Sequence, residues 1–388
     1  MKLIKNIPIK KTIKILITSI TSLLLVVSLF AFLIINSYIN KMQLISSEDN
    51  TLIDKTLENE KLASEIDLKS LSESGTDQPS DIEIETVDAA SVNASQQDEI
   101  LTFEENIRIN MESNQTPIMQ DKDVFNILLI GSDTRKVGGN GRSDAMIVIS
   151  INKKTKEIIA TSLLRDIYLH IPGKSNNRIN AAYALGGADL LMDTLEENFK
   201  LQIDRYVSVD FFAFIDIVDA IGGVTLEVSE KDIPVINGYI EEINTLTGQE
   251  ITKDQLTEEG TYLLNGKQTL GYVRNRYVGN SDFERTNRQR KVLEKIFEGV
   301  KGLNLLELNK LMNTLLPQVT TNLTQGEIFS LILSVPSFAK YDLKQWRIPI
   351  DGSYTGVRIK GMSVLGIDFE KNIKEIQRKI YGVENASP

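Results

Sequence analysis

From residue 124 onward, apolar positions recur at strand and helix spacing, and this pattern predicts a folded domain. Three apolar runs that end in polar residues are typical of buried strands, with residues 152–155 as the turn between the last two: residues 124–133 (VFNILLIGSD), 144–152 (DAMIVISIN) and 156–166 (KEIIATSLLRD). The chain then alternates between helical and strand patterns: helices at 179–185 and 188–199 around a Gly-Gly break, a strand at 205–210, a helix at 211–221 and a strand at 224–228. This alternation predicts an α/β domain with helices on the faces of a central sheet.

The second half of the domain is expected to be mainly helical. Residues 229–260 are predicted to form a polar loop with a short helix. The elements expected after it are helices at 264–276, 305–315, 325–333 and 370–381, and a late strand at 346–350. Val292, Leu293, Ile296, Phe297 and Val300 recur at helical spacing and predict a further helix with a buried face.

The N-terminal region has a different pattern. Residues 15–35 carry no charge over 21 positions, which is enough for a helix that spans a bilayer. A cleavable signal peptide is the alternative, but the apolar run is long and no small-x-small cleavage site follows it. Five lysines lie within residues 1–14, which predicts a cytoplasmic tail and an extracellular position for the rest of a single-pass protein of the cell membrane.

Residues 36–122 are predicted to form an acidic, extracytoplasmic stalk. Between residues 43 and 122 there are 19 Asp and Glu against 5 Lys and Arg, with few aromatic residues. This composition is typical of a largely disordered segment, with some helix expected at 52–71. Binding of a basic partner is the alternative to a plain spacer. The catalytic domain is expected to occupy residues 123–388.

Composition limits the chemistry. The chain of 388 residues has no cysteine and one histidine, so disulfides, thiolate nucleophiles and cysteine zinc sites are excluded. His170 lies in an apolar alternation, IYLHIP, and is expected to be structural. Catalysis must therefore rest on carboxylates, arginines, hydroxyls and an oxygen-bound metal.

The densest positive cluster lies in residues 271–292, GYVRNRYVGNSDFERTNRQRKV. Its arginines favour binding of fixed phosphates, because a guanidinium is always charged and its planar fork matches phosphate oxygens: Arg274, Arg276, Arg285, Arg288 and Arg290. Arg285, Arg288 and Gln289 continue the buried face of the predicted helix, which suggests that they point into a cleft. The alternative is a solvated helix in which the arginines pair with Asp282, Glu284 and Glu294.

Further charged residues follow the predicted strands: Asp133, Arg142, Asp144, Arg165 and Asp166. Carboxylates and arginines at strand ends suggest a site for a metal and a phosphate, with Asp133 and Asp144 as ligands of Mg²⁺ and Mn²⁺ as the alternative ion. In the competing interpretation, Asp133 caps a turn and Asp144 forms an ion pair with Arg142. Nucleotide triphosphates are scarce outside the cell, so a membrane-linked pyrophosphate is the favoured substrate.

Several motifs together resemble one known family. NILLIGSDTR, GRSDAMIV, LLRD, NRINAAYALGG, LNGKQTLGYVRNR and SDFERTNRQRKV occur in the order and approximate spacing of the LytR-CpsA-Psr family, over about residues 123–320. The resemblance implies one membrane helix followed by an extracellular α-β-α sandwich with a central mixed sheet, in a Gram-positive type of envelope. It also implies transfer of an anionic glycopolymer, such as wall teichoic acid or capsular polysaccharide, from an undecaprenyl-pyrophosphate carrier to the C6 hydroxyl of N-acetylmuramic acid in peptidoglycan.

The resemblance also implies roles for individual residues. Asp133 and Asp144 are expected at Mg²⁺. The expected pyrophosphate ligands are Arg142, Arg165, Arg274, Arg276, Arg285 and Gln289. Arg274, Arg276 and Asp144 would act in catalysis. Asp166 and Asp282 are the candidates for the base that deprotonates the acceptor, with Asp144 as the alternative if the metal is held by other groups. Phe211, Phe212 and Phe214 either line an apolar tunnel for the polyprenyl chain or pack in the core.

Three other functions compete with a transferase. Family members have been named for transcriptional attenuation, but a tail of about 14 residues cannot hold a helix-turn-helix, and the folded domain lacks the positive charge for nucleic acid. A non-catalytic polyprenyl-phosphate binder would hold lipid without transferring anything. A hydrolase would direct water instead of a glycan hydroxyl at the pyrophosphate.

Overall fold

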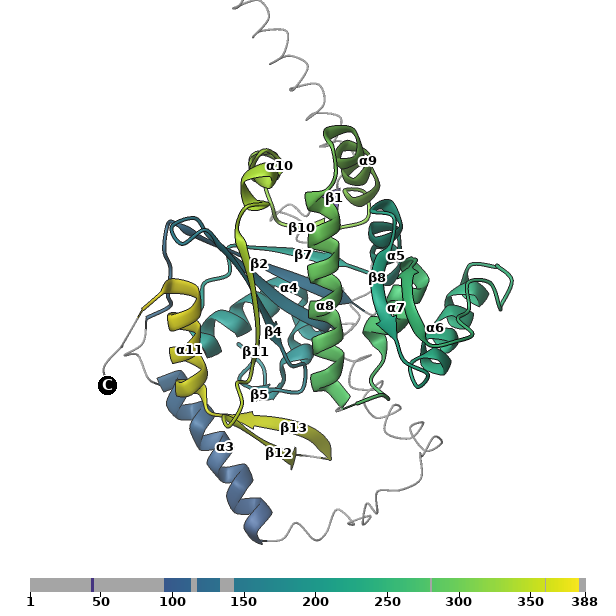
Figure 1. The fold of residues 1–388 in the computed structure, drawn as a ribbon. Helices are drawn as coiled ribbons and strands as arrows, with labels where there is room; N and C mark the ends of the chain where they lie inside the picture. Colours follow the sequence, from purple (N-terminus) through teal and green to yellow (C-terminus); the bar gives the residue numbers. More distant parts are fainter. Residues whose placement is uncertain are drawn as a thin grey trace, which may run out of the picture.

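The computed structural model describes residues 43–44, 94–112, 117–132, 143–279, 281–359 and 361–383 (Figure 1). The predicted cytoplasmic tail, the predicted membrane helix and most of the predicted stalk lie outside these residues. No helix within the described ranges is both long and apolar enough to cross a membrane.

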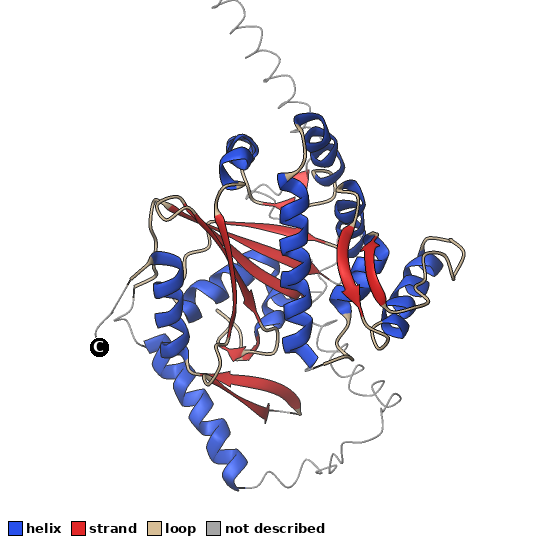
Figure 2. Cartoon of the chain, viewed as in Figure 1, coloured by secondary structure: helices blue, strands red, loops and turns tan. Residues whose placement is uncertain are grey.

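A seven-stranded mixed sheet forms the centre of the domain (Figure 2). β2 lies parallel to β7 and antiparallel to β3, β3 is antiparallel to β4, and β4 is parallel to the late strand β11. The three apolar runs thus form neighbouring strands, as their pattern predicts. The order across the sheet is β1 (Gln43–Leu44), β10 (Thr320–Thr321), β7 (Arg205–Val209), β2 (Val124–Ser132), β3 (Ser143–Asn152), β4 (Glu157–Leu163) and β11 (Asp342–Ile348).

Helices cover both faces of this sheet (Figure 1). α4 (Ile179–Phe199) and α11 (Phe369–Tyr381) pack on the face that buries Leu128 and Val148. Gly186 and Gly187 have non-helical backbone angles and divide α4 into two helical segments, as predicted, and Gly187 has a φ of 69° that favours glycine. α8 (Ser281–Lys301) crosses the other face, where Gln345 of β11 donates a 2.9 Å hydrogen bond to Glu294. The α/β fold with a central mixed sheet is therefore confirmed.

A second, smaller core lies beside the sheet. It is built from α5 (Phe211–Ala220), α6 (Ile233–Leu246), α7 (Gly266–Arg274) and the hairpin of β8 (Val224–Val228) with β9 (Gly260–Leu264). The expectation of a short helix in a polar loop was wrong, because α6 has 14 residues and buries Ile236, Ile240 and Ile243. β8 pairs with β9 and does not join the central sheet. Phe211 and Phe214 pack against this core, whereas Phe212 is 39% exposed.

Shorter elements complete the domain. α9 (Leu305–Leu315) and α10 (Gln325–Phe338) follow α8, and α10 runs five residues beyond its predicted end. β5 (Tyr168–Leu169) pairs with β6 (Asn177–Arg178), and β12 (Tyr354–Ile359) pairs with β13 (Met362–Ile367). The β12–β13 hairpin was not predicted, because a two-stranded element with one exposed face carries a weak apolar signal.

The predicted stalk needs one correction. Residues 94–112 form α3 (Ala94–Glu112), which packs on the domain. Ile107 is 3% exposed in the main core, and Asn110 donates a 3.0 Å hydrogen bond to the carbonyl of Asn198. Tyr168 donates a 2.9 Å hydrogen bond to Glu104 of the same helix. The folded unit therefore begins before residue 123, and acidic composition concealed a helix whose inner face is apolar.

Candidate functional site

Arg165 is the centre of the candidate site. It follows β4, and its guanidinium lies near three carboxylates: Asp144 of β3, Asp282 of α8 and the adjacent Asp166. Nε donates to Oδ2 of Asp282 at 3.0 Å and lies 3.7 Å from Oδ2 of Asp166, while Nη1 lies 3.2 Å from Oδ1 of Asp144. Although burial opposes it, the charges of Asp282, Asp166 and Asp144 raise the pKa of Arg165. The predicted gathering of carboxylates and arginines at strand ends is therefore present in the described residues.

The first turns of α8 complete this cluster. Asp282 lies between two guanidinium groups, because Nη2 of Arg285 is 3.1 Å from its Oδ1. Arg285 is 5% exposed, and its Nε is buried without a hydrogen-bond partner in the described part of the chain. Burial and the nearby charge of Arg165 lower the pKa of Arg285. A buried donor with no acceptor is costly, so this corner favours an added anion.

Asp166 and Asp282 form a carboxylate pair with unequal basicity. Burial and a hydrogen bond with Asp282 raise the pKa of Asp166 to about 6. Burial acts against ionisation of Asp282 too, but the hydrogen bond from Asp166 and the charges of Arg285 and Arg165 outweigh it and lower the pKa of Asp282. The pair thus shares a proton that is held mainly by Asp166 below about pH 6.

Sequence reasoning missed Arg178 as part of this cluster. It ends β6, and its Nη1 lies 3.4 Å from Oδ1 of Asp166. Its Nε is buried and has no hydrogen-bond partner among the described residues. The motif NRINAAYALGG contains Arg178, but nothing in its spacing indicates that the β5–β6 hairpin returns it to the end of β4.

Arg288 has a different position from the one expected. It does not point into a cleft, because Arg288 and Asp232 are each 6% exposed and form a 3.1 Å ion pair. Its Nη1 also donates to the carbonyls of Asn275 and Val278, both at 3.0 Å. Asn275 completes the network with a 2.8 Å hydrogen bond to Asp232. These contacts of Arg288 therefore stabilise the packing of α8 on the smaller core.

Two more of the predicted arginines lie at the end of α7. Arg274 stacks between two aromatic rings, with its guanidinium 4.1 Å from the centre of Phe211 and 4.4 Å from that of Tyr239, and it lies 3.6 Å from Glu242. Arg276 is exposed next to Tyr277. Gln289 is half-buried one turn after Arg285. Among the contacts described, none of these three residues forms an ion pair with Asp144, Asp166 or Asp282.

The metal prediction rests partly on residues that the structure does not describe. Asp133 and Arg142 lie outside the described residues, whereas Asp144 is within them and keeps about a quarter of its side chain exposed. No group of three or more His, Cys, Asp or Glu residues that could hold a metal occurs within the described ranges. His170 lies 3.2 Å from Asn176 through Nδ1 and belongs to a loop network.

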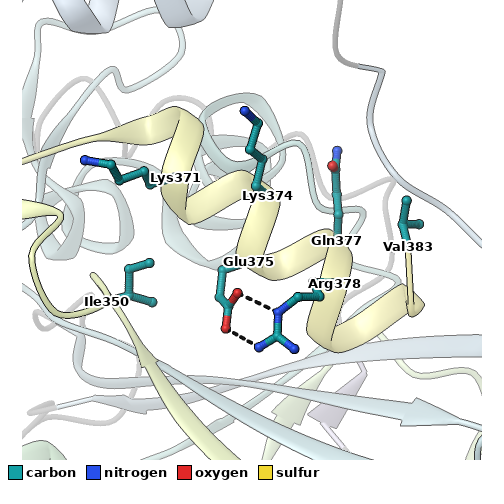
Figure 3. A pocket seen from close by; sticks show the side chains of 7 residues that line it. All are labelled: Ile350, Lys371, Lys374, Glu375, Gln377, Arg378 and Val383. Carbon is teal, nitrogen blue, oxygen red and sulfur yellow. Dashed lines mark hydrogen bonds and ion pairs between the residues drawn. The ribbon is translucent and has the colours of Figure 1, made fainter. Parts of the chain in front are cut away.

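A pocket of about 310 Å³ lies on α11 (Figure 3). Its cations are already paired, because Arg378 makes two hydrogen bonds with Glu375, at 2.8 and 2.6 Å, and Lys374 lies 2.6 Å from Glu370. Lys371 pairs with Asp368 at 3.0 Å. The pocket is formed by residues of α11 and its surroundings and includes none of the predicted site residues.

Comparisons with known proteins agree on one family. The chain matches the model of the LytR_cpsA_psr family over residues 83–380. It is 32% identical to the polyisoprenyl-teichoic acid–peptidoglycan teichoic acid transferase TagU of Enterococcus faecalis, over 68% of this chain and 80% of that protein. It is 33% identical to the regulatory protein MsrR of Staphylococcus aureus, over 62% of this chain and 69% of that protein.

The fold is also similar to solved structures. The LytR-CPS2A-psr family protein YwtF (TagT) with bound octaprenyl pyrophosphate lipid is 27% identical, with a TM-score of 0.51 over 69% of this chain and 96% of that one. The family match begins before residue 123 and includes α3. It also includes each of the residues that form the Arg165 cluster. The chain therefore belongs to the LytR-CpsA-Psr family.

Proposed function

We propose that this chain is a membrane-anchored phosphotransferase of the cell envelope. It would attach an anionic glycopolymer, carried on polyprenyl pyrophosphate, to peptidoglycan through a phosphodiester at N-acetylmuramic acid. The observation that carries the proposal is the cluster in which Arg165 and Arg285 face Asp144, Asp166 and Asp282. The relative TagU, named as a teichoic acid transferase, and the lipid-bound TagT structure support the choice of substrates.

Arginines on two sides of α8 are suited to hold the pyrophosphate. Arg285 contributes a buried Nε that has no acceptor in the described part of the chain, and Arg165 has its planar fork at the end of β4. Arg142, Arg274, Arg276 and Gln289 are proposed to complete the pyrophosphate site. Bidentate contacts from guanidinium groups neutralise the charge that builds up on phosphate oxygens during transfer.

The sheet face under α8 offers apolar surface for the lipid. Leu129, Ile149 and Val207 are only half-buried, although they lie on central strands. Their neighbours on the opposite face, Leu128 and Val148, are fully buried. Because side chains alternate across a strand, the half-buried residues share one face and leave aliphatic surface for a polyprenyl chain.

The proposed reaction moves one phosphoryl-linked polymer. The C6 hydroxyl oxygen of the acceptor forms a bond to the phosphorus next to the sugar, and the bond from that phosphorus to the bridging oxygen breaks. The products are the glycan phosphodiester and polyprenyl phosphate. Asp166 takes the hydroxyl proton, because its raised pKa makes it a better base than Asp282, which is held ionised by two arginines.

Mg²⁺, or Mn²⁺ in its place, is proposed as the cofactor. Asp144 fits this role, because it is a partly exposed carboxylate whose described partner is Arg165. Mg²⁺ commonly binds one or two carboxylates together with substrate phosphates, so Asp133 and Asp144 would suffice without a larger protein cage. When bound, the ion would neutralise phosphate charge.

A membrane position follows from the predicted helix at residues 15–35. We propose that the N-terminus is cytoplasmic and that the domain lies outside the cell, near its lipid-linked donor. Protease added to intact protoplasts should then digest the domain. Full protection of the domain would reverse this topology.

A reconstitution tests the function. The full-length chain in detergent, a short polyprenyl-pyrophosphate-linked sugar, Mg²⁺ and peptidoglycan oligomers are combined, and the glycan is analysed by mass spectrometry. The proposal predicts a phosphodiester adduct that is lost in Asp144→Ala, with Asp216→Ala, an exposed carboxylate on α5, as the control. Free sugar phosphate without an adduct would indicate a hydrolase, and intact lipid that stays bound would indicate a binder.

A further inference from the structure

One stripe of α8 faces β11. Phe283, Arg290 and Glu294 share this stripe, because they are spaced seven and four residues apart on the helix. Glu294 accepts the hydrogen bond from Gln345 of β11, and the guanidinium of Arg347, also on β11, lies 4.6 Å from the ring centre of Phe283. The function proposed above does not use this stripe.

Arg290 and Arg347 approach each other at this stripe, and Arg290 forms no ion pair with a carboxylate within the described residues. Burial and the charge of Arg347 lower the pKa of Arg290, against the opposing charge of Glu284. Nη1 of Arg290 is buried with no hydrogen-bond partner among the described residues, and its Nη2 donates to the neutral Asn287. Arg347 pairs with Asp351, whose side chain is 89% exposed. Two like charges and an unpaired buried donor favour an anionic ligand.

Aromatic rings extend the same surface toward the candidate site. Phe283 and Tyr354 lie with ring centres 5.1 Å apart, and Arg347 is also within 5.8 Å of the Tyr354 ring. Phe283 follows Asp282 directly. The β12–β13 hairpin that carries Tyr354 is tied to the site by a 2.8 Å hydrogen bond from the amide of Leu365 to the carbonyl of Asp166. Phe283 and Tyr354 therefore lie next to Asp166 and Asp282, the carboxylate pair that would activate the acceptor.

Arg290, Arg347, Phe283 and Tyr354 lie on the other flank of α8 from the end of α7, which carries Arg274 of the proposed donor site. α7, which ends at Arg274, and β11, which carries Arg347, lie on opposite sides of α8 (Figure 1). A donor held by Arg274 and Arg276 thus leaves the β11 side for the second substrate. A peptidoglycan strand combines sugar rings with peptide carboxylates, and a guanidinium binds carboxylate in bidentate fashion.

We infer that Arg290 and Arg347, with the rings of Phe283 and Tyr354, form the acceptor subsite and bind a carboxylate of the peptidoglycan strand. This inference rests on the proposed transferase function and assigns residues to its second substrate. In this arrangement the rings provide apolar surface beside the sugar, and the two arginines set the position of the strand relative to Asp166.

Direct binding tests the subsite without the need for turnover. Short peptidoglycan oligomers with free peptide carboxylates, and the same oligomers with those carboxylates amidated, are titrated into the full-length chain. The free acid should bind about tenfold more tightly, as expected for a charge-assisted hydrogen bond. Arg290→Gln should lose this preference and Arg347→Lys should reduce it. Lys291→Gln, which removes one charge from the exposed side of the same helix, should keep it.

Turnover then separates the subsite from the function. Arg290→Gln should raise KM for the acceptor by about tenfold, with kcat and KM for the donor within about twofold of the parent. An unchanged acceptor KM and an unchanged carboxylate preference in Arg290→Gln would overturn the subsite, as would a loss confined to donor binding. If the parent chain binds the free acid more tightly than the amidated oligomer but forms no phosphodiester, the transferase function is refuted. The carboxylate-binding site is then still supported.

Discussion

Arg165 contacts Asp144, Asp166 and Asp282 with one planar group, and this geometry leads to a sharp prediction. Lysine keeps the charge but cannot bridge three carboxylates, so Arg165→Lys should lower transfer by about 100-fold, the equivalent of two charge-assisted hydrogen bonds. Initial rates measure the effect. Arg108→Lys, on the exposed side of α3, serves as the control and should leave the rate unchanged. If Arg165→Lys kept a rate within threefold of the parent, the planar guanidinium would not be required to hold the three carboxylates.

Asp166 predicts the pH dependence of activity. Its pKa is raised to about 6 by burial and by its hydrogen bond with Asp282, and only the ionised form accepts the proton of the acceptor. Transfer should therefore fall as the pH drops through about 6, and kcat/KM measured from pH 5 to 8 checks this. Asp166→Asn should be much slower, and its kcat/KM should not show this fall at acidic pH. If kcat/KM of Asp166→Asn still fell with the same midpoint, the titrating group would be one other than Asp166.

The same carboxyl group links pH to stability. The folded state binds the proton of Asp166 more tightly than the unfolded chain, whose carboxyl has an ordinary pKa near 3.8. Its contribution to the free energy of unfolding should thus be full below about pH 4 and decline as the pH rises to about 6. Denaturation at several pH values in the parent and in Asp166→Asn isolates this contribution. A steeper decline in the variant would contradict the sign.

At the residue scale, sequence could identify charges but not their partners. Arg285 and Arg288 lie three residues apart on the same predicted helix face, and both were expected in a cleft. Arg285 joins the Arg165 cluster, whereas Arg288 pairs with Asp232, which lies 56 residues earlier and on the smaller core. Arg178 reaches Asp166 only through the β5–β6 hairpin. Such contacts are set by tertiary packing, which a linear pattern does not contain.

Among the elements, α3 shows how the domain extends into the acidic segment. Ile107 is 3% exposed and Ile109 is 52% exposed on the same helix, so they form a matched pair. Ile107→Ala should lower the free energy of unfolding by about 2–4 kcal/mol, and Ile109→Ala by less than about 0.5 kcal/mol. Chemical denaturation measures both changes. Equal effects would mean that α3 does not pack on the core in solution.

α8 depends on the buried Arg288–Asp232 pair for its attachment to the smaller core. Arg288→Ala leaves an unpaired buried carboxylate and two carbonyls without their donor, and should destabilise the fold by about 3–5 kcal/mol. Lys295→Ala, in a more exposed pair on the same helix, should change stability by less than about 1 kcal/mol. A fully stable Arg288→Ala variant that had lost only activity would place Arg288 in the site instead.

The helices and strands with strong periodicity were predictable, and the weak ones were not. β2, β3 and β4 follow from long apolar runs, because buried strands of a central sheet need apolar residues on both faces. α6 was underestimated, because polar residues on its outer side conceal the spacing of Ile236, Ile240 and Ile243. β8 has a clear alternation, but its pairing with β9 rather than the sheet is a tertiary choice.

Across the whole molecule, the candidate site lies where the two cores meet. α8 belongs to both, because Phe283 packs on the main core and Val292 is buried in the smaller one. β3 supplies Asp144, the turn after β4 supplies Arg165 and Asp166, and α8 supplies Asp282 and Arg285. Correct placement of the reacting groups therefore requires both cores and the helix between them.

An isotope label on the donor follows the phosphorus through the proposed reaction. The phosphorus next to the sugar of a polyprenyl-pyrophosphate-linked donor is labelled with ³²P, and the full-length chain is incubated with Mg²⁺ and peptidoglycan oligomers. The label should move into the glycan as a phosphodiester, and the released polyprenyl phosphate should be unlabelled. Label that stays with the lipid, or that appears only as free sugar phosphate, would contradict the proposed reaction.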